Sequence, residues 1–436
     1  MNIVRVWRGE VGKLAVPILI GMLPDSIASL VSMVVASRIS SEALAGVGLA
    51  SYFFFIVNAI SSIFVTGLLV VLSQAHGAGR RDVVERAFSE SLLLSILLSL
   101  LILATAPLWV RGYVSILSAG RAEYEAGIYL MSRLLSTPAL MVNSVLAAAY
   151  RALEKPWPPS ISAIVSATSS ATLIPLLAFG YAEPLPRGIA GMGLASAISQ
   201  YLGLSAYLFF EKPVRAKLCT FSKNSLKVLA IGVPASVERL VASIGQNVYI
   251  NAVAKSGVSA LAAHTIGINV ESIVINPVFA ISIASSARVG FHVGSKSSRE
   301  VDSVARESLL IGISWMSIAT AVLLAISPFV GRAFTENAEV AELVKFYLVY
   351  AAISEVGLGG SLAIQGVIRG MGNTWIPLVV NSLTITLLRA ALAQVLQPVL
   401  GVHGVWFTQI TDMYGRLFVS YAIYAKFKDK LVVRVS

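Results

Sequence analysis

The sequence is poor in charged residues and in cysteine. Charged side chains make up 13% of its 436 residues, half of the ~25% that is typical of soluble domains. Charges as few as these cannot cover the surface of a water-soluble protein of this length. The composition therefore excludes a water-soluble protein. A single cysteine, Cys219, excludes a disulfide-stabilised extracellular scaffold. The hydrophobic content of 56% excludes a disordered chain.

Sequence motifs for catalysis and cofactor binding are also missing. The chain has no phosphate-binding loop of the Gly-x-x-x-x-Gly-Lys type, no nucleophile elbow and no metal-ligand spacing among its four histidines. A membrane-embedded enzyme would need paired catalytic or metal-binding residues at one depth, and none is evident. We therefore expect no enzymatic activity and no cofactor.

Long apolar runs account for most of the chain, whose mean hydropathy is +0.81. A transmembrane helix needs about 20 mostly apolar residues. Because the apolar runs lack the alternation of strands, we predict an all-α polytopic membrane protein with twelve transmembrane helices. The twelve runs are 11–37, 43–76, 87–110, 123–150, 157–180, 187–212, 225–254, 258–292, 303–329, 341–368, 374–397 and 402–426.

The basic residues predict how the chain is oriented. The net charge of +11 lies in short clusters between the apolar runs, which is typical of a membrane surface rather than of nucleic-acid binding. The termini and the loops after even-numbered spans hold 21 of the 33 lysines and arginines, and the alternate loops hold 7. This bias places both termini in the cytoplasm. The N-terminal segment lacks a small-residue cleavage site, so we expect it to be retained in a multi-pass protein of the cell membrane.

The two halves of the chain repeat one another. A shift of 217 residues places Val16-Pro17 on Val233-Pro234, and Gly77 on Gly294. Each half has six spans, an even number, so the repeats are parallel and related by an axis along the membrane normal. Such repeats favour a transporter whose central cleft opens to either side. The predicted domains are an N-terminal lobe at 1–212, a basic cytoplasmic linker at 213–227 and a C-terminal lobe at 228–436.

Several short motifs recur in order within these repeats. They are Leu14-Ala-Val-Pro17, Glu42-Ala-Leu-Ala-Gly-Val-Gly-Leu49, Ser73-Gln-Ala-His-Gly-Ala-Gly79, Gly232-Val-Pro234, Ala260-Leu-Ala-Ala263 and Val367-Ile-Arg-Gly-Met-Gly372. In their order and spacing, these motifs resemble those of the multidrug and toxic compound extrusion (MATE) family of the MOP flippase superfamily. The resemblance implies two six-helix lobes that form a V, and export of an organic substrate in exchange for inward-moving H⁺ or Na⁺.

Four acidic residues lie near the middle of predicted spans, where carboxylates are costly and mark ion pathways. They are Asp25 in the first span, Glu238 in the seventh, Glu271 in the eighth and Glu355 in the tenth. Three acids that converge in a low-dielectric interior cannot all stay ionised, so the site takes up a proton or binds a cation. Any Na⁺ is therefore expected at Glu238, Glu271 and Glu355, and no other metal is expected.

The family resemblance favours the C-terminal lobe for ion coupling. Proton-linked relatives carry an aspartate where this chain has Ser32, and an Asp-Pro pair where it has Ile174-Pro175. Asp25 lies two helical turns before Ser32 on the same face, and could replace the missing acid at another depth. Polar residues that could line the substrate cavity are Ser32, Gln246, Asn247, Asn251, Asn276 and Arg389.

Arginines and prolines within the spans suggest structural roles. Asp412 and Arg416 are four residues apart and are predicted to pair along one helix. Arg389 needs an acidic partner, for which Glu355 or Glu271 is the candidate. The two repeat prolines, Pro17 and Pro234, are expected to bend their helices and act as gating hinges.

Together these features predict a monomeric secondary antiporter whose partners are the lipid bilayer and a small organic substrate. It would export amphipathic, cationic xenobiotics by alternating access between the lobes, in exchange for H⁺ or Na⁺. A lipid-linked saccharide flippase of the same superfamily is the alternative, although its cavity would be cationic rather than acidic.

Overall fold

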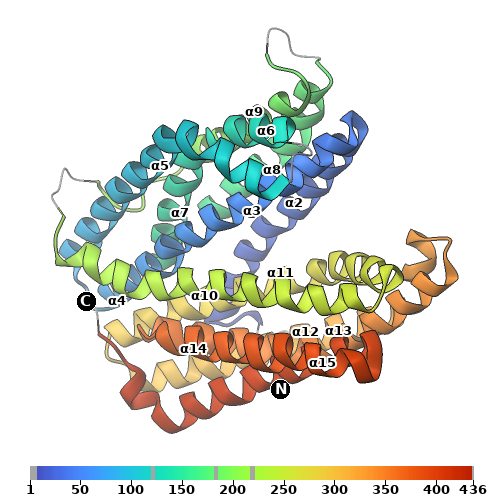
Figure 1. Ribbon diagram of the computed structural model, residues 1–436. Coiled ribbons are helices and arrows are strands. Elements are labelled where there is room, and N and C mark those ends of the chain that lie inside the picture. Colours follow the sequence, from blue (N-terminus) through green and yellow to red (C-terminus); the bar gives the residue numbers. More distant parts are fainter. Residues whose placement is uncertain (1–6, 119–122, 181–184, 217–220, 435–436) are drawn as a thin grey trace. The chain divides into compact units, whose positions relative to one another are not determined.

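The described residues are almost entirely helical, as expected for the all-α class. A computed structural model describes residues 7–118, 123–180, 185–216 and 221–434, within which no strand occurs (Figure 1). The predicted all-α fold is confirmed.

The first half of the chain contains eight α-helices, a short π-helix and a 3-10 turn within these described residues. In chain order they are α2 (Glu10–Ile39), α3 (Ser41–Ser62), the π-helix η1 (Ile63–Leu68), α4 (Leu69–Gly77), α5 (Arg81–Ser118), α6 (Glu123–Leu134), α7 (Thr137–Ala152), α8 (Trp157–Ala178), α9 (Gly188–Ser205) and the 3-10 turn η2 (Ala206–Phe209).

The second half has longer helices. They are α10 (Lys223–Lys255), α11 (Val258–Gly294), α12 (Ser298–Phe334), α13 (Ala338–Gly370), α14 (Trp375–Leu383), the π-helix η3 (Thr384–Ala391) and α15 (Leu392–Leu431). Polar residues begin two of the helices in this chain. Ser40 accepts a hydrogen bond from the Ala43 amide before α3, and Asn337 caps the amides that begin α13.

Each of the twelve predicted spans coincides with helical segments. Among the described residues, nine helices are long and apolar enough to cross a membrane, and the pair of α6 and α7, bent by 47°, makes ten when it is counted as one span. The longest candidate, Trp375–Leu431, covers two predicted spans. Gly401 adopts a non-helical conformation inside it and separates the two. The short helix α9 occupies the remaining predicted span.

Two compact units make up the chain. The C-terminal unit comprises Met1–Val16, Ser73–Arg80 and Val233–Ser436, and the N-terminal unit comprises Pro17–Leu72 and Arg81–Gly232. The division therefore passes through α2 at Pro17 and through α10 one residue before Pro234. The lobe boundaries drawn at 213–227 from the sequence remain a prediction.

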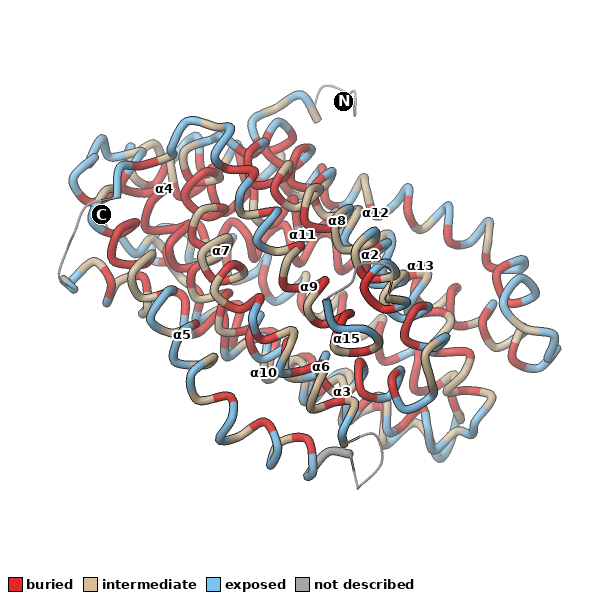
Figure 2. The backbone as a smooth tube through the Cα atoms, turned by 90° about the horizontal axis from the view of Figure 1, so that it is seen from above, coloured by how far each residue is buried: buried red, intermediate tan, exposed pale blue. Residues whose placement is uncertain are grey.

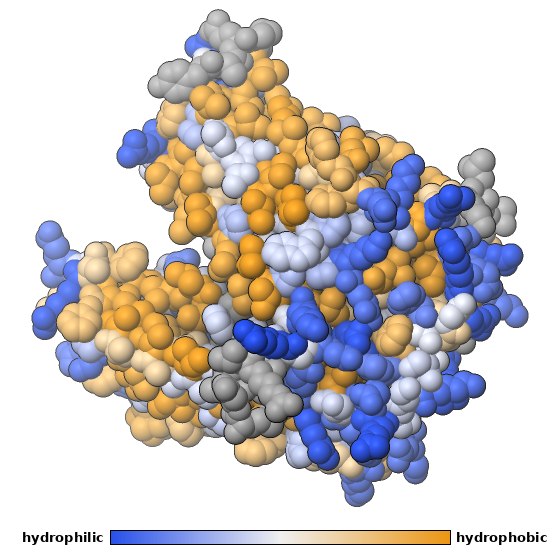
Figure 3. Space-filling model, turned by 180° about the vertical axis from the view of Figure 1, so that it is seen from behind, coloured by the Kyte–Doolittle hydropathy of each residue, from blue (hydrophilic) through white to orange (hydrophobic). Residues whose placement is uncertain are grey.

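The surface of both units carries many large apolar side chains. Leu108 is 84% exposed and Phe209 is 87% exposed. On the face shown in Figure 3, broad apolar areas adjoin an area where hydrophilic side chains gather. Exposed apolar area on this scale is unfavourable in water, and fits contact with lipid tails.

Helix α13 forms the centre of the C-terminal unit. Its most apolar window is 78% buried, and it packs against α11, α12 and α15. Glycines allow this close packing, since a Cβ on Gly359 would lie 2.5 Å from the carbonyl oxygen of Gly312 on α12. In Figure 2, buried residues follow one another along the tubes of this region. Most side chains of the candidate site described below lie on α13 and on the helices that pack against it.

Gly359→Ala is expected to destabilise the protein by about 1–3 kcal/mol, because the added methyl group overpacks the α12–α13 contact. The measurement is the thermal unfolding of purified protein in detergent, followed by tryptophan fluorescence. Gly112→Ala on α5 is the matched control, since a Cβ there meets nothing within 4 Å. Equal unfolding temperatures for the two variants would contradict this account of helix packing.

Candidate functional site

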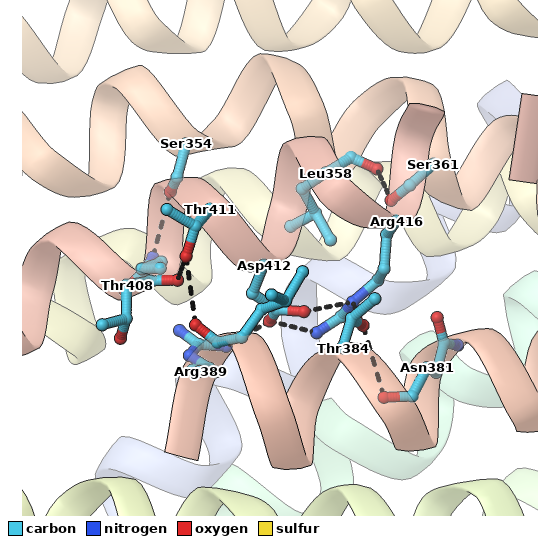
Figure 4. A network of polar contacts seen from close by, with 12 residues as sticks. Ser354, Leu358, Ser361, Asn381, Thr384, Arg389, Thr408, Thr411, Asp412 and Arg416 are labelled. Carbon is cyan, nitrogen blue, oxygen red and sulfur yellow. Dashed lines mark hydrogen bonds and ion pairs between the residues drawn. The ribbon is translucent and has the colours of Figure 1, made fainter. Parts of the chain in front are cut away.

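A buried ion-pair network surrounds Asp412 in the C-terminal unit (Figure 4). Asp412 is 0% exposed. Its Oδ1 accepts a hydrogen bond of 3.0 Å from Arg416 Nε, and its Oδ2 accepts one of 2.5 Å from the guanidinium of the same arginine. The predicted pair of Asp412 and Arg416 is confirmed.

Asp412 also pairs with a second arginine. A guanidinium nitrogen of Arg389 lies 3.7 Å from Asp412 Oδ2. The expectation that Arg389 would pair with Glu355 or Glu271 was therefore wrong. Arg389 lies in the π-helix η3, whose wider turn displaces side chains from the α-helical positions that a sequence reading assumes. One carboxylate thus faces two buried guanidinium groups.

Glu271 on α11 is fully hydrogen-bonded inside the same unit. Its Oε2 accepts a 2.5 Å hydrogen bond from the Tyr347 hydroxyl, and its Oε1 accepts one of 2.6 Å from Gln409 Nε2. The same Gln409 nitrogen donates to Ser354 Oγ at 3.1 Å. Both oxygens of Glu271 are therefore occupied by donors from α13 and α15.

Glu355 on α13 is the least satisfied acidic group of this region. It is 0% exposed, and neither of its oxygens accepts a hydrogen bond from the described residues. The Glu271 carboxyl and the Arg389 guanidinium are the charged groups that act on it. A carboxyl group that has lost its water and gained no donor is stabilised by binding a proton or a cation. Of the four acids selected from the sequence, Glu355 best fits ion coupling.

Aromatic and histidine side chains border these two acids, and the sequence reading missed them. The His264 ring lies 5.0 Å from the Tyr347 ring and 5.7 Å from the Tyr249 ring, measured between centroids. The Arg389 guanidinium lies 4.9 Å above the Tyr249 ring. A sequence signal existed, because His264 and Glu271 are seven residues apart and so lie on one face of a helix.

Glu238 belongs to a second network that is built around other helices. Its Oε1 accepts hydrogen bonds from Arg369 at 2.7 Å and from Asn381 Nδ2 at 2.6 Å. Asn381 and Gln365 exchange hydrogen bonds of 2.7 and 3.1 Å, and Gln365 donates to Ser420 at 3.2 Å. This network ties α10 to α13, α14 and α15.

The three acids of the C-terminal unit are thus not gathered in one site. Glu238 has a guanidinium partner of its own, whereas Glu271 and Glu355 interact with each other. Throughout the part of the chain that the structure describes, no three His, Cys, Asp or Glu side chains are placed to hold a metal ion. Arg369, which the repeat motif contains, was not recognised from the sequence as the partner of Glu238.

The remaining selected residues are dispersed. Asp25 is exposed on α2, and Ser32 on the same helix is half-buried. Pro17 and Pro234 are buried inside α2 and α10. On α10, Gln246 is half-buried, Asn247 and Asn251 are exposed, and the side chain of Asn276 on α11 lies outside the described residues.

Comparison with known proteins gives one consistent result. The MatE family model matches residues 17–176 and 234–395. The chain is 26% identical over 421 residues to the "Probable multidrug resistance protein NorM" of Thermotoga maritima. This match covers 94% of this chain and 90% of that protein.

Solved structures share the fold. An outward-facing multidrug resistance MATE family transporter of the MOP superfamily matches with a TM-score of 0.90 and 19% identity, over 99% of both chains. A MOP superfamily transporter from Pyrococcus furiosus, described as having a binding pocket of reverse polarity, matches with a TM-score of 0.89 and 18% identity, over 99% of both chains.

Proposed function

Because the chain belongs to the MatE family, the multidrug and toxic compound extrusion transporters, we propose that it exports amphipathic, cationic organic compounds in exchange for inward-moving H⁺ or Na⁺. The family consists of membrane transporters rather than enzymes. The resistance protein from Thermotoga maritima, which is similar over nearly its whole length, supports drug-like substrates.

The buried carboxyl group of Glu355 carries this proposal. It lies on the central helix of the C-terminal unit beside Glu271, without a hydrogen-bond donor among the described residues. Filling such a site with an ion changes the charge of a buried region, so the ion stabilises one conformation relative to another. If the organic cation stabilises the opposite conformation, the two fluxes are coupled. Glu271 would hold the second carboxyl of the coupling site.

We further propose that transport proceeds by alternating access of the two lobes. The division between the compact units falls at Pro17 in α2 and beside Pro234 in α10. Proline removes a backbone hydrogen bond and weakens the helix locally, so both positions suit hinges. The excess of basic residues in alternate segments supports cytoplasmic termini and a place in the cell membrane.

Flux of an organic cation in proteoliposomes tests the function. Ethidium is loaded inside, and a pH gradient or a Na⁺ gradient is imposed separately. We expect one gradient to drive ethidium flux in the wild type, and Glu355→Gln to reduce this flux by about tenfold or more, since the site can no longer change charge.

Glu336→Gln is the control for this experiment, because Glu336 is an exposed acid after α12 in the same unit. It should transport like the wild type. A Glu355→Gln variant with unchanged gradient-driven flux would place the coupling site elsewhere, with Asp25 as the next residue to test. If no gradient moved any organic cation, drug export would be refuted, and lipid-linked saccharide flipping would be the function to test.

A further inference from the structure

Unpartnered polar atoms gather in the core of the C-terminal unit. Buried polar atoms nearly always have a hydrogen-bond partner, so a group of exceptions in one place points to a ligand or internal water. Seven of the thirteen such side-chain atoms in the described residues belong to this core. They are the hydroxyl of Tyr249, both ring nitrogens of His264, both carboxyl oxygens of Glu355, Nε of Arg389 and Nε1 of Trp406.

Ring contacts place these side chains beside one another. The His264 ring contacts Tyr249 of α10 and Tyr347 of α13, and Tyr347 contacts Trp406 of α15 at a centroid distance of 5.5 Å. Tyr347 also donates its hydroxyl proton to Glu271, which interacts with Glu355. These contacts therefore link His264, through Tyr347, to the two acids inside the apolar helix bundle.

The charges around these side chains disfavour a metal cation. The Arg389 guanidinium acts on Glu271, Glu355 and His264, so a permanent positive charge is already present. Both oxygens of Glu271 accept hydrogen bonds from Tyr347 and Gln409. Hard cations bind through several oxygen ligands at once, whereas a proton needs a single acceptor. Glu355 offers two oxygens without a hydrogen-bond donor among the described residues, which is enough for a proton but few ligands for a hard cation.

His264 has the chemistry to pass a proton on. A neutral imidazole has one donor and one acceptor nitrogen, so it can take up a proton at one nitrogen and release one from the other. The groups that face it are Tyr249 of α10 and Tyr347 of α13, whose rings contact the imidazole, and Arg389 of η3, whose charge acts on it. Tyr347 in turn connects it to Glu271 of its own helix α11.

We propose that the coupling ion is a proton, and that His264 relays it through internal water between the solvent and the carboxyl pair of Glu355 and Glu271. The proton that enters binds one imidazole nitrogen, and the proton on the other nitrogen passes to a Glu355 oxygen, so charge and atoms balance. This inference rests on the proposed antiport function and names its ion.

The test measures proton and sodium coupling separately in proteoliposomes. Ethidium flux is recorded with a pH gradient in Na⁺-free buffer, and with a Na⁺ gradient at equal pH on both sides, while pyranine reports the internal pH. We expect the pH gradient alone to drive wild-type flux, with proton movement that depends on ethidium. His264→Gln should slow both fluxes by about tenfold or more, since a lost relay raises the barrier, and leave ethidium binding unchanged.

His403→Gln is the matched control, since His403 lies in the same unit on α15 and contacts aromatic rings. It should keep wild-type flux. Wild-type flux in His264→Gln would overturn the relay, and flux driven by Na⁺ would overturn the proton while leaving the antiport function intact. Failure of both gradients would instead refute the antiport function itself. If His264→Gln does not fold, the comparison of the two gradients in the wild type still decides the ion.

Discussion

Asp412→Asn is expected to lower the free energy of unfolding by about 3–5 kcal/mol, because it removes the carboxylate with which two buried guanidinium groups pair. Asp412 receives two hydrogen bonds from Arg416 and lies 3.7 Å from Arg389. The asparagine side chain has nearly the same volume, so the loss reports the charge rather than a cavity.

The measurement is thermal and chemical unfolding of purified protein, with Asp302→Asn as the control. Asp302 pairs with Lys428 in a bridge whose side chains are 36% and 41% exposed, so its loss is expected to destabilise the protein far less than the loss of Asp412. Replacing Arg416 by Gln in the Asp412→Asn background should restore part of the stability, because one unpaired charge is removed. Equal effects of the two Asn variants would show that the Asp412 network contributes no more than a surface pair.

The spans could be predicted from the sequence because lipid requires about 20 apolar residues in each, and this requirement is local. Local breaks in the helices could not. The π-helical turns η1 and η3 follow from no residue pattern in Ile63–Leu68 or Thr384–Ala391, because tertiary packing decides them. The break at Gly401 is different, because it falls in the gap at 398–401 between the last two predicted spans.

In the candidate site, the contacts between residues close in the sequence could be predicted, and those between distant residues could not. Asp412 and Arg416 lie one turn apart on α15, so their spacing is sufficient. Arg369 is 131 residues from Glu238, and no spacing rule joins them. His264 lies in an apolar run, where a histidine is usually a core residue, and its spacing of seven residues from Glu271 was the one signal in the sequence. The depth of an acid can be read from one helix, but its partners come from other helices.

Glu238→Gln and Arg369→Gln are each expected to destabilise the protein by about 2 kcal/mol, and the double variant by less than the sum of the two. Glu238 and Arg369 are 12% and 15% exposed, so each single variant leaves a mostly buried charge unpaired. The unfolding temperatures of the two single variants and the double variant measure the interaction between Glu238 and Arg369. Additive losses would mean that the ion pair contributes nothing beyond its separate groups.

The same variants decide whether Glu238 is structural or couples the ion. Glu238 lies four residues after Pro234, so its bonds to Arg369 and Asn381 fasten α10 beyond the hinge to α13 and α14. If fastening is its role, the folded double variant should keep its response to the coupling gradient while its maximal flux falls, because a looser hinge transmits less of the motion. A folded double variant that transports ethidium without responding to any gradient would instead place Glu238 in the coupling site with Glu271 and Glu355.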